Sequence, residues 1–246
     1  HVGGLAGCSD GAEIHNSTAN VAVSVGEGDA GTAIGGLVGF LSNGAVYVCT
    51  SGGVVTIGTL NDPESFAAAG GFVGLTYGSI WNCYATGAVT GGDATDLGGF
   101  VGYTGWGSEI NNCYARGNIE GNDDAGVGGF VGYAYEGYIQ NCYATGDTTG
   151  GNYSDVGGFN GDYDDASVWD CYFNLDAIQQ QDGFDVDPAA SSEGIGMNAG
   201  AMQNDEFMET LNENVDTIEP QNDEWAASMA FSEWTRADGT NGGYPY

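Results

Sequence analysis

Gly128-Gly129-Phe130-Val131-Gly132, followed by Ile139-Gln140-Asn141-Cys142-Tyr143-Ala144-Thr145-Gly146, is the stretch that decides the fold. Six related pairs of blocks occur, and their first glycines are Gly3, Gly35, Gly70, Gly98, Gly128 and Gly157. These starts differ by 32, 35, 28, 30 and 29 residues. The distance from the first Gly to the Cys position is 14, 14, 13, 15, 14 and 14 residues. So constant a register indicates a structural repeat.

The repeat predicts an all-β fold. Each copy contains short β-branched and aromatic runs bounded by Gly, Asn, Asp and Ser, which is strand-and-turn chemistry. One copy cannot bury its own apolar face, but stacked copies can. We therefore predict a parallel β-helix (β-solenoid) of about six coils over residues 1–173, and a C-terminal capping or contact segment with one helix over residues 174–246. A β-propeller is the alternative, but its blades need about 40 residues.

Stacking turns equivalent positions into ladders, meaning columns of similar side chains in consecutive coils. The predicted ladders are Leu37, Phe72, Phe100, Phe130 and Phe159; Val46, Ile80, Ile110, Ile139 and Val168; Asn16, Asn82, Asn112 and Asn141; and Tyr84, Tyr114, Tyr143 and Tyr172. The asparagines are expected at a turn, with their amides bonded along the axis. An odd spacing between the Ile and Cys columns predicts a bend or bulge, and which columns point inward stays open.

The blocks resemble a known repeat. Gly-Gly-Phe-Val-Gly followed by Ile-x-Asn-Cys-Tyr-Ala-Thr-Gly is similar to the GLUG-motif repeat of bacterial and archaeal surface proteins, over residues 3 to about 173. The end of the chain, with Trp234 and 242–246, resembles the tail that often closes such arrays. The resemblance implies the solenoid and an extracellular or cell-surface location. It implies no single activity, since such repeats accompany adhesins, proteases and other secreted proteins. The first two repeats depart from the pattern at Ser17 and at 48–50, as expected of capping repeats.

The charge balance is extreme. Asp and Glu number 34 and Lys and Arg number 2, giving a net charge of −32. Such a surface repels phosphates, which excludes nucleic acid and anionic membranes as partners. It fits a halophilic surface screened by salt or a surface that binds calcium, and the scarcity of Lys favours the first. No apolar run approaches the ~20 residues of a membrane span. The opening at His1 inside a repeat suggests a processed or truncated start, and sequons at Asn16 and Asn152 are consistent with secretion.

Acidic residues recur just before the Gly-Gly blocks. Asp93, Asp123 and Asn152 stand five residues before a block, and Asp96 and Asp155 stand two residues before one. Stacked carboxylates repel unless a cation lies between them. The predicted calcium ligands are Asp93, Asp96, Asp123, Asn152, Asp155, Asp162 and Asp164. Ca²⁺ is the one cofactor expected, and a solvated, salt-screened edge is the alternative.

Five cysteines share one column: Cys49, Cys83, Cys113, Cys142 and Cys171. Neighbours in the column lie within disulfide range. However, an in-register parallel pair points its Cβ atoms alike, and five members cannot all pair. We predict a buried ladder of small apolar thiols, with one or two disulfides or a metal site as alternatives. Cys8 lies outside the column.

The C-terminal segment changes character. Asn198 is predicted to cap a helix over 199–212, with Met202, Phe207, Met208 and Leu211 on one face. Its aromatic residues are Trp225, Phe231, Trp234, Tyr244 and Tyr246. We expect them to cover the open end or flank of the solenoid, which would block edge-to-edge pairing. The alternative is contact with the next subunit.

Three functions are compatible with these features. The first is an extracellular structural or adhesive element, including a subunit that stacks end to end in a filament stabilised by cations or high salt; its partners would be copies of itself or surface glycans. The second is a glycan-binding module that uses Tyr103, Trp106, Tyr133 and Tyr135. The third is a hydrolase with a carboxylate pair drawn from Asp162, Asp164 and Asp165. Because no nucleophile–base pair, zinc motif or phosphate loop occurs in the sequence, we expect a non-enzyme.

Overall fold

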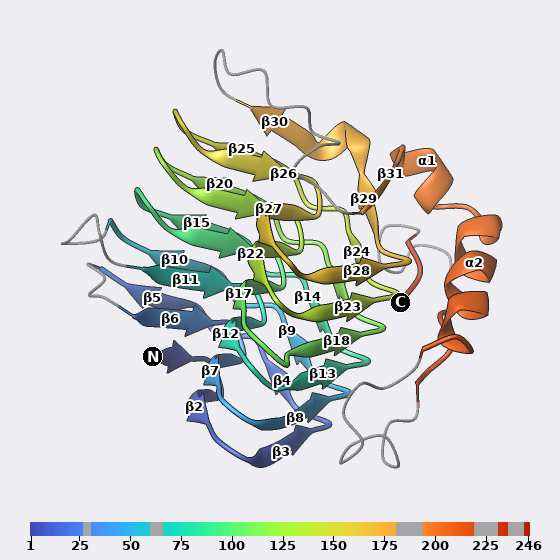
Figure 1. Ribbon diagram of the computed structural model, residues 1–246, viewed down its shortest axis with the longest axis horizontal. Coiled ribbons are helices and arrows are strands. Elements are labelled where there is room, and N and C mark those ends of the chain that lie inside the picture. Colours follow the sequence, from blue (N-terminus) through green and yellow to red (C-terminus); the bar gives the residue numbers. More distant parts are fainter. Residues whose placement is uncertain (27–30, 60–65, 181–193, 219–230, 236–243) are drawn as a thin grey trace.

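The protein is a stack of coils wound through five parallel sheets. The computed structural model describes residues 1–26, 31–59, 66–180, 194–218, 231–235 and 244–246. Each coil passes through sheets A, B, C, D and E in turn, and the next coil lies on top of it (Figure 1). The predicted parallel β-solenoid is confirmed. The coil count differs slightly from the predicted six, because five turns lead from β1 to β26 and the last pass, which ends at β30, is interrupted by a 3-10 helix, η1 (Leu175–Ala177).

The strands are short and each sheet contains one strand per coil. Sheet A comprises β1 (Val2–Gly3), β6 (Thr32–Gly35), β11 (Ala67–Gly70), β16 (Asp96–Gly98), β21 (Gly126–Gly128) and β26 (Asp155–Gly157). Sheet B comprises β2 (Ala6–Ser9), β7 (Val38–Leu41), β12 (Val73–Thr76), β17 (Val101–Thr104), β22 (Val131–Tyr135) and β27 (Asn160–Asp164). Sheet C comprises β3 (Ala12–His15), β8 (Gly44–Tyr47), β13 (Ser79–Trp81), β18 (Glu109–Asn111), β23 (Tyr138–Gln140) and β28 (Ser167–Trp169).

The remaining two sheets complete the coil. Sheet D comprises β4 (Thr18–Ala19), β9 (Thr50–Ser51), β14 (Tyr84–Ala85), β19 (Tyr114–Ala115), β24 (Tyr143–Ala144), β29 (Tyr172–Asn174) and β31 (Ile195–Met197). Sheet E comprises β5 (Val23–Val25), β10 (Val55–Ile57), β15 (Val89–Gly91), β20 (Ile119–Gly121), β25 (Thr148–Gly150) and β30 (Ile178–Gln180). The domain boundary at residue 173 remains a prediction.

Two apolar clusters fill the interior. The larger, between sheets B, C and D, contains the predicted Phe, Ile and Cys columns, which therefore all point inward. Rings of Phe72, Phe100, Phe130 and Phe159 stack with centroids 4.7, 4.8 and 4.9 Å apart. This is the distance between neighbouring strands, so stacking follows from the coil spacing itself. The smaller cluster lies between sheets A and E and is built mainly from Val, Ile, Leu and Ala side chains.

The Gly-Gly block makes the sharp bend from sheet A to sheet B. A Cβ atom on Gly70 would lie 2.0 Å from the carbonyl oxygen of Val73, and one on Gly74 would lie 2.4 Å from the backbone nitrogen of Ile34. Both neighbours are backbone atoms, which cannot move aside without breaking the sheet. Only glycine fits these positions, which explains why the block marks the register of every repeat.

A second bend lies between sheets C and D, as the odd column spacing predicts. Asn82, Asn112 and Asn141 adopt left-handed φ angles of 53°, 56° and 52°, a conformation that Asn tolerates. The Asn112 Nδ2 atom donates to Asn82 Oδ1 at 2.7 Å, and Asn141 Nδ2 donates to Asn112 Oδ1 at 3.0 Å. The asparagine ladder is thus confirmed for three of its four predicted members. Asn16 is separated from them by Val48, whose side chain has no amide group.

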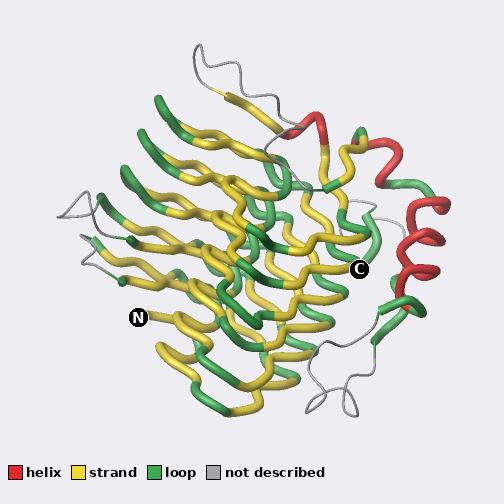
Figure 2. Tube along the Cα trace, in the orientation of Figure 1, coloured by secondary structure: helices red, strands yellow, loops and turns green. Residues whose placement is uncertain are grey.

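The C-terminal segment covers the flank of the solenoid beside sheet D (Figure 2). The single helix predicted over 199–212 is wrong, because that described stretch contains two helices, α1 (Ala199–Met202) and α2 (Asp205–Val215). Asn204 is the reason: its backbone is extended and its Oδ1 accepts a hydrogen bond from Phe207 N at 2.8 Å, so it caps a new helix. Asn198 caps α1 as predicted.

The predicted apolar face of the helical segment is confirmed. Met202, Phe207 and Leu211 are buried against the tyrosines of sheet D. The ring of Phe207 lies 5.8 Å from that of Tyr143 and 5.1 Å from that of Tyr172. Trp234 and Tyr244 join this cluster, whereas Trp225 lies outside the described residues. Within the described ranges, no helix is both long and apolar enough to cross a membrane.

Candidate functional site on the outer face of sheet C

Two columns of side chains cover the outside of sheet C. Ile80, Ile110 and Ile139 point into the core, so the residues on either side of each must point outward. One outer column contains Glu13, Ala45, Ser79, Glu109, Tyr138 and Ser167. The other contains His15, Tyr47, Trp81, Asn111, Gln140 and Trp169. This face therefore combines aromatic rings, amides and the two carboxylates of Glu13 and Glu109.

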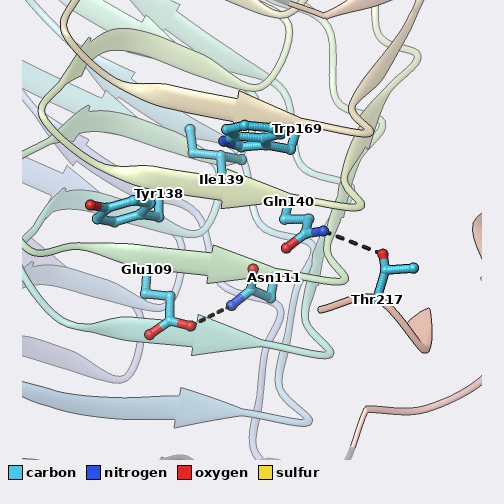
Figure 3. Close-up of a pocket in the computed structure, with 7 residues that line it drawn as sticks. All are labelled: Glu109, Asn111, Tyr138, Ile139, Gln140, Trp169 and Thr217. Atoms are coloured by element: carbon cyan, nitrogen blue, oxygen red, sulfur yellow. Dashed lines mark hydrogen bonds between the residues drawn. The ribbon is translucent and has the colours of Figure 1, made fainter. Parts of the chain in front are cut away.

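A cavity of about 290 Å³ lies on this face where β18, β23 and β28 run side by side (Figure 3). Its lining residues are Glu109, Asn111, Tyr138, Ile139, Gln140, Trp169 and Thr217. Thr217 follows α2, so the C-terminal segment supplies one wall. We refer to this feature as the sheet C cavity.

The floor of the sheet C cavity is polar and fixed. Glu109 and Asn111 are each only 2% exposed, and Asn111 Nδ2 donates to Glu109 Oε1 at 2.8 Å. Burying a carboxyl group is costly unless it is hydrogen-bonded. The amide of Asn111 meets part of that need and holds the Glu109 oxygens in one orientation.

The rim is aromatic and open. Tyr138 is 42% exposed and Trp169 is 64% exposed. Gln140 is next to both positions in the outer columns. Among the residues that the structure describes, its Nε2 atom makes only long contacts, to Asp170 Oδ2 at 3.4 Å and Thr217 Oγ1 at 3.5 Å. Contacts of that length are weak. The Gln140 amide can therefore be redirected to a ligand at small cost.

This arrangement suits a saccharide. Exposed rings offer apolar faces for the C–H side of a sugar, and amide and carboxylate groups bind its hydroxyls. The net charge of −32 repels anionic saccharides, which leaves neutral ones. Arg116, one of the two basic residues, lies over the ring of Tyr244 at 5.5 Å, in the covered flank rather than in the cavity lining.

The four aromatic residues predicted from the sequence to form a glycan-binding surface (the predicted platform) lie in two separate places. Tyr103, Tyr133 and Tyr135 do come together, on sheet B, with Tyr103 centroids 5.3 and 6.4 Å from the other two. They are half-buried, and burial raises the pKa of Tyr103 to about 12. Trp106 lies apart from them, in the turn from sheet B to sheet C, and is 75% exposed. The predicted platform used only residues near the Gly-Gly block and therefore missed Tyr138. Because Tyr138 directly precedes Ile139, which points inward, its side chain is expected to point outward.

The predicted calcium ligands are distributed over three places. Asp93, Asp123 and Asn152 share the turn from sheet E to sheet A, where Asp123 Oδ1 accepts from Asn152 N at 2.7 Å and from its Nδ2 at 3.1 Å. Asp96 and Asp155 lie on sheet A, and β27 carries Asp162 and Asp164. Across the described part of the chain, no three His, Cys, Asp or Glu side chains are grouped closely enough to hold a metal ion. Calcium binding stays a prediction.

Asp96 has the most altered titration of these carboxyls. Burial, reinforced by the charge of Asp162, raises its pKa to about 7. The same two causes raise the pKa of Asp155. A Cβ atom on Gly126, which separates Asp96 from Asp155 in sheet A, would lie 2.9 Å from Asp96 Oδ1. The Asp96 carboxyl therefore leans across the next coil toward the sheet B strand that carries Asp162.

The cysteine column is a buried ladder of free thiols, as predicted. Cys49 N donates to Cys83 Sγ at 3.3 Å, and the same contact recurs between Cys83 and Cys113 at 3.4 Å and between Cys113 and Cys142 at 3.4 Å. The disulfide alternative is not realised, since all six cysteines are free. Cys8 is exposed on β2.

The geometry defines a class of protein, the parallel β-solenoid built from repeats of about thirty residues. Four segments, residues 1–24, 67–90, 93–120 and 123–149, match the family model "The GLUG motif". The chain therefore contains four GLUG repeats. No curated protein matches the chain. Among solved structures it is similar to the crystal structure of a candidate immunoglobulin A1 protease from Bacteroides ovatus, with 20% identity and a TM-score of 0.60 over 100% of this chain and 74% of that chain. At that identity the likeness shows the fold alone.

Proposed function

We propose that this chain is an extracellular adhesive module that binds a neutral saccharide in the sheet C cavity. The observation that supports this best is the pairing of a fixed polar floor, Glu109 with Asn111, and an open aromatic rim, Tyr138 with Trp169. Small-ligand sites commonly combine apolar or aromatic walls with a few oriented polar groups. The cavity volume of about 290 Å³ suits one or two sugar rings lying against the rim.

Location and adhesion rest on the surface chemistry. A net charge of −32 keeps the protein away from nucleic acids and anionic membranes and suits a salt-rich exterior. The stacked sheets give a rigid body, so a ligand held on one face would be presented in a fixed direction. Cations or high salt would reduce repulsion among its carboxylates. We expect binding without turnover.

The test is a binding screen against neutral polysaccharides, namely mannan, xylan, galactan, laminarin and soluble cellulose derivatives, followed by calorimetry. Trp169→Ala is expected to weaken binding about tenfold, since an aromatic contact contributes up to about 1.5 kcal/mol. Tyr153→Ala is the matched control, because Tyr153 is 71% exposed and lies in the turn before sheet A, outside the cavity lining. Binding of no polysaccharide, or equal loss in both variants, would refute the proposal. Hydrolysis of the bound polysaccharide, abolished by Asp164→Asn, would make the chain a hydrolase instead.

End-to-end assembly is a second candidate. It is favoured by the first coil, whose strands β1 to β5 are edge strands and whose Leu5 is 50% exposed at the end of the Phe ladder. Exposed edges and apolar ends favour pairing with another coil. At the opposite end β31 covers β29. A concentration-dependent mass in sedimentation, lost in Leu5→Glu, would support assembly, and a monomer at all concentrations and salt levels would exclude it.

A further inference from the structure

A second cavity adjoins the sheet C cavity. It has a volume of about 440 Å³ and is lined by Trp106, Gly107, Glu136, Gly137, Tyr138, Asp165 and Ser167. Tyr138 lines both cavities. Its ring, 42% exposed, therefore separates two hollows that follow each other along sheet C and the turn before it. We call the second hollow the turn cavity.

The backbone that carries Trp106 forms a defined turn. Ser108 N donates to Gly105 O at 3.0 Å, and Gly107 has a φ of +77°, so residues 105–108 form a tight β-turn with glycine at its third position. A Cβ atom on Gly107 would meet nothing within 4 Å, so this side of the turn is open. The repeat that contains Trp106 has the longest distance from first Gly to Cys, 15 residues. The longer connection lets the turn project from the coil.

The two cavities share one chemistry. Each has an indole on its outer side, Trp106 in the turn cavity and Trp169 in the sheet C cavity, with the Tyr138 ring between them. Each also has carboxylates, from Glu136 and Asp165 in one and from Glu109 in the other. Apart from Thr217, the lining residues of both come from consecutive coils of the stack, so the spacing of Tyr138 and Trp169 is set by the pairing of β23 with β28.

We infer that the two cavities are subsites of one groove that binds an extended, linear neutral oligosaccharide, with successive sugar rings against Trp106, Tyr138 and Trp169. This inference rests on the proposed function and adds the length of the ligand. The turn cavity, about 440 Å³, lies within the range of ordinary ligand sites, roughly 300–1,000 Å³, and the sheet C cavity, about 290 Å³, lies just below it. A ligand confined to the sheet C cavity would leave Trp106 without a role in binding.

The experiment measures affinity against chain length. The probes are short and long oligosaccharides fractionated from an acid hydrolysate of the polysaccharide that binds in the screen. The native protein is expected to bind the long fraction at least tenfold more tightly than the short one. Trp106→Ala is expected to weaken binding of the long fraction roughly three- to tenfold and to leave the short fraction unchanged. Tyr138→Ala is expected to weaken binding of both fractions. Tyr153→Ala is expected to leave binding of both fractions unchanged.

The possible results distinguish the inferred groove from the proposed saccharide binding on which it rests. If no polysaccharide binds, the proposed function fails and the groove fails with it. If a polysaccharide binds but affinity does not rise with length, or Trp106→Ala is without effect on the long fraction, the function stands and the groove is refuted. Equal losses for both fractions in Trp106→Ala would likewise refute it, because the two cavities would then not be separate subsites. Trp106 is 75% exposed, so loss of folding does not confound this variant.

Discussion

The outer faces of sheets C and D both carry aromatic side chains from the repeats, but these side chains differ in their exposure to solvent. On sheet D, Tyr143 is fully buried and Tyr114 is 5% exposed beneath the C-terminal segment. On sheet C only part of the face is open: Trp81 is 1% exposed, whereas Tyr138 and Trp169, in the last two coils, are 42% and 64% exposed. A β-solenoid presents every column outside its core to solvent unless something covers it. The covered tyrosines of sheet D contribute to stability, and the exposed part of sheet C, around Tyr138 and Trp169, is available to a ligand.

The contrast between sheets C and D would be wrong if the covered tyrosines of sheet D contributed no more to stability than the exposed aromatic residues of sheet C. Tyr143→Ala is expected to lower the free energy of unfolding by about 3–5 kcal/mol, as for a large buried aromatic side chain. Its ring packs against Phe207 and Trp234, and its hydroxyl donates to the Pro245 carbonyl. Trp169→Ala is the matched variant on the open face and should change stability by less than about 0.5 kcal/mol. Urea denaturation measures both, and equal losses would contradict the assignment.

The asparagine ladder marks the border between the two faces and holds the cover. Asn112 Nδ2 donates to Ser232 O at 2.9 Å, and Asn141 Nδ2 to Leu211 O at 3.1 Å. Asn112→Ala removes buried hydrogen bonds and places Ala at a left-handed φ, so a loss of about 2–4 kcal/mol is expected. Asn112→Gly, which tolerates that φ, isolates the amide contribution. Protease cleavage within the C-terminal segment should quicken in both variants; unchanged cleavage would show that the ladder does not anchor the cover.

A third region, the corner of sheets A and B, carries several carboxyl groups, among them Asp96, Asp155 and Asp162. The unfolded chain titrates Asp near 3.8, whereas the folded chain raises the Asp96 pKa to about 7. The folded state thus holds this proton more tightly, so stability falls as pH rises from about 4 to about 7 and then levels off. Asp96→Asn should match the native protein near pH 4 and exceed it at pH 8 by roughly 1–3 kcal/mol. Identical pH profiles in thermal melts would argue against a raised pKa.

The smallest expected effect concerns calcium at the turn from sheet E to sheet A. Asp93, Glu120 and Asp123 line one cavity of about 310 Å³ there. If the cation prediction holds, excess Ca²⁺ should raise the melting temperature by about 2–4 °C relative to a chelator, which corresponds to ~1 kcal/mol. Asp123→Asn should reduce that gain, and Asp205→Asn, on α2, should not. The same shift with Mg²⁺ or Na⁺ at equal ionic strength would indicate screening and no bound calcium.

Much of the interior followed from the sequence because repetition alone aligns it. Once the Gly-Gly blocks fix the register, Phe72 must lie under Phe100, and Cys83 under Cys113. The bend at Asn82 followed from the column spacing. Repetition says nothing about parts that do not repeat. The break at Asn204, the burial of Tyr143 and the wall at Thr217 all depend on where the C-terminal segment docks. The predicted platform gathered Tyr103 with Tyr133 but missed Trp169 for a different reason: it used only residues after the Gly-Gly block, whereas Trp169 lies in the second block, beside Val168.

The thiol ladder has one consequence for how the stack opens. Each coil from the second to the sixth carries one buried cysteine, from Cys49 to Cys171, whereas Cys8 in the first coil is exposed. A thiol-reactive reagent can modify the buried sulfurs only when their own coil separates from its neighbours. Cys8 should react at once, and each later cysteine at the rate of local opening around it. The native chain therefore contains its own set of position-specific reporters, one per coil, that would resolve whether the solenoid frays from an end or opens as a unit.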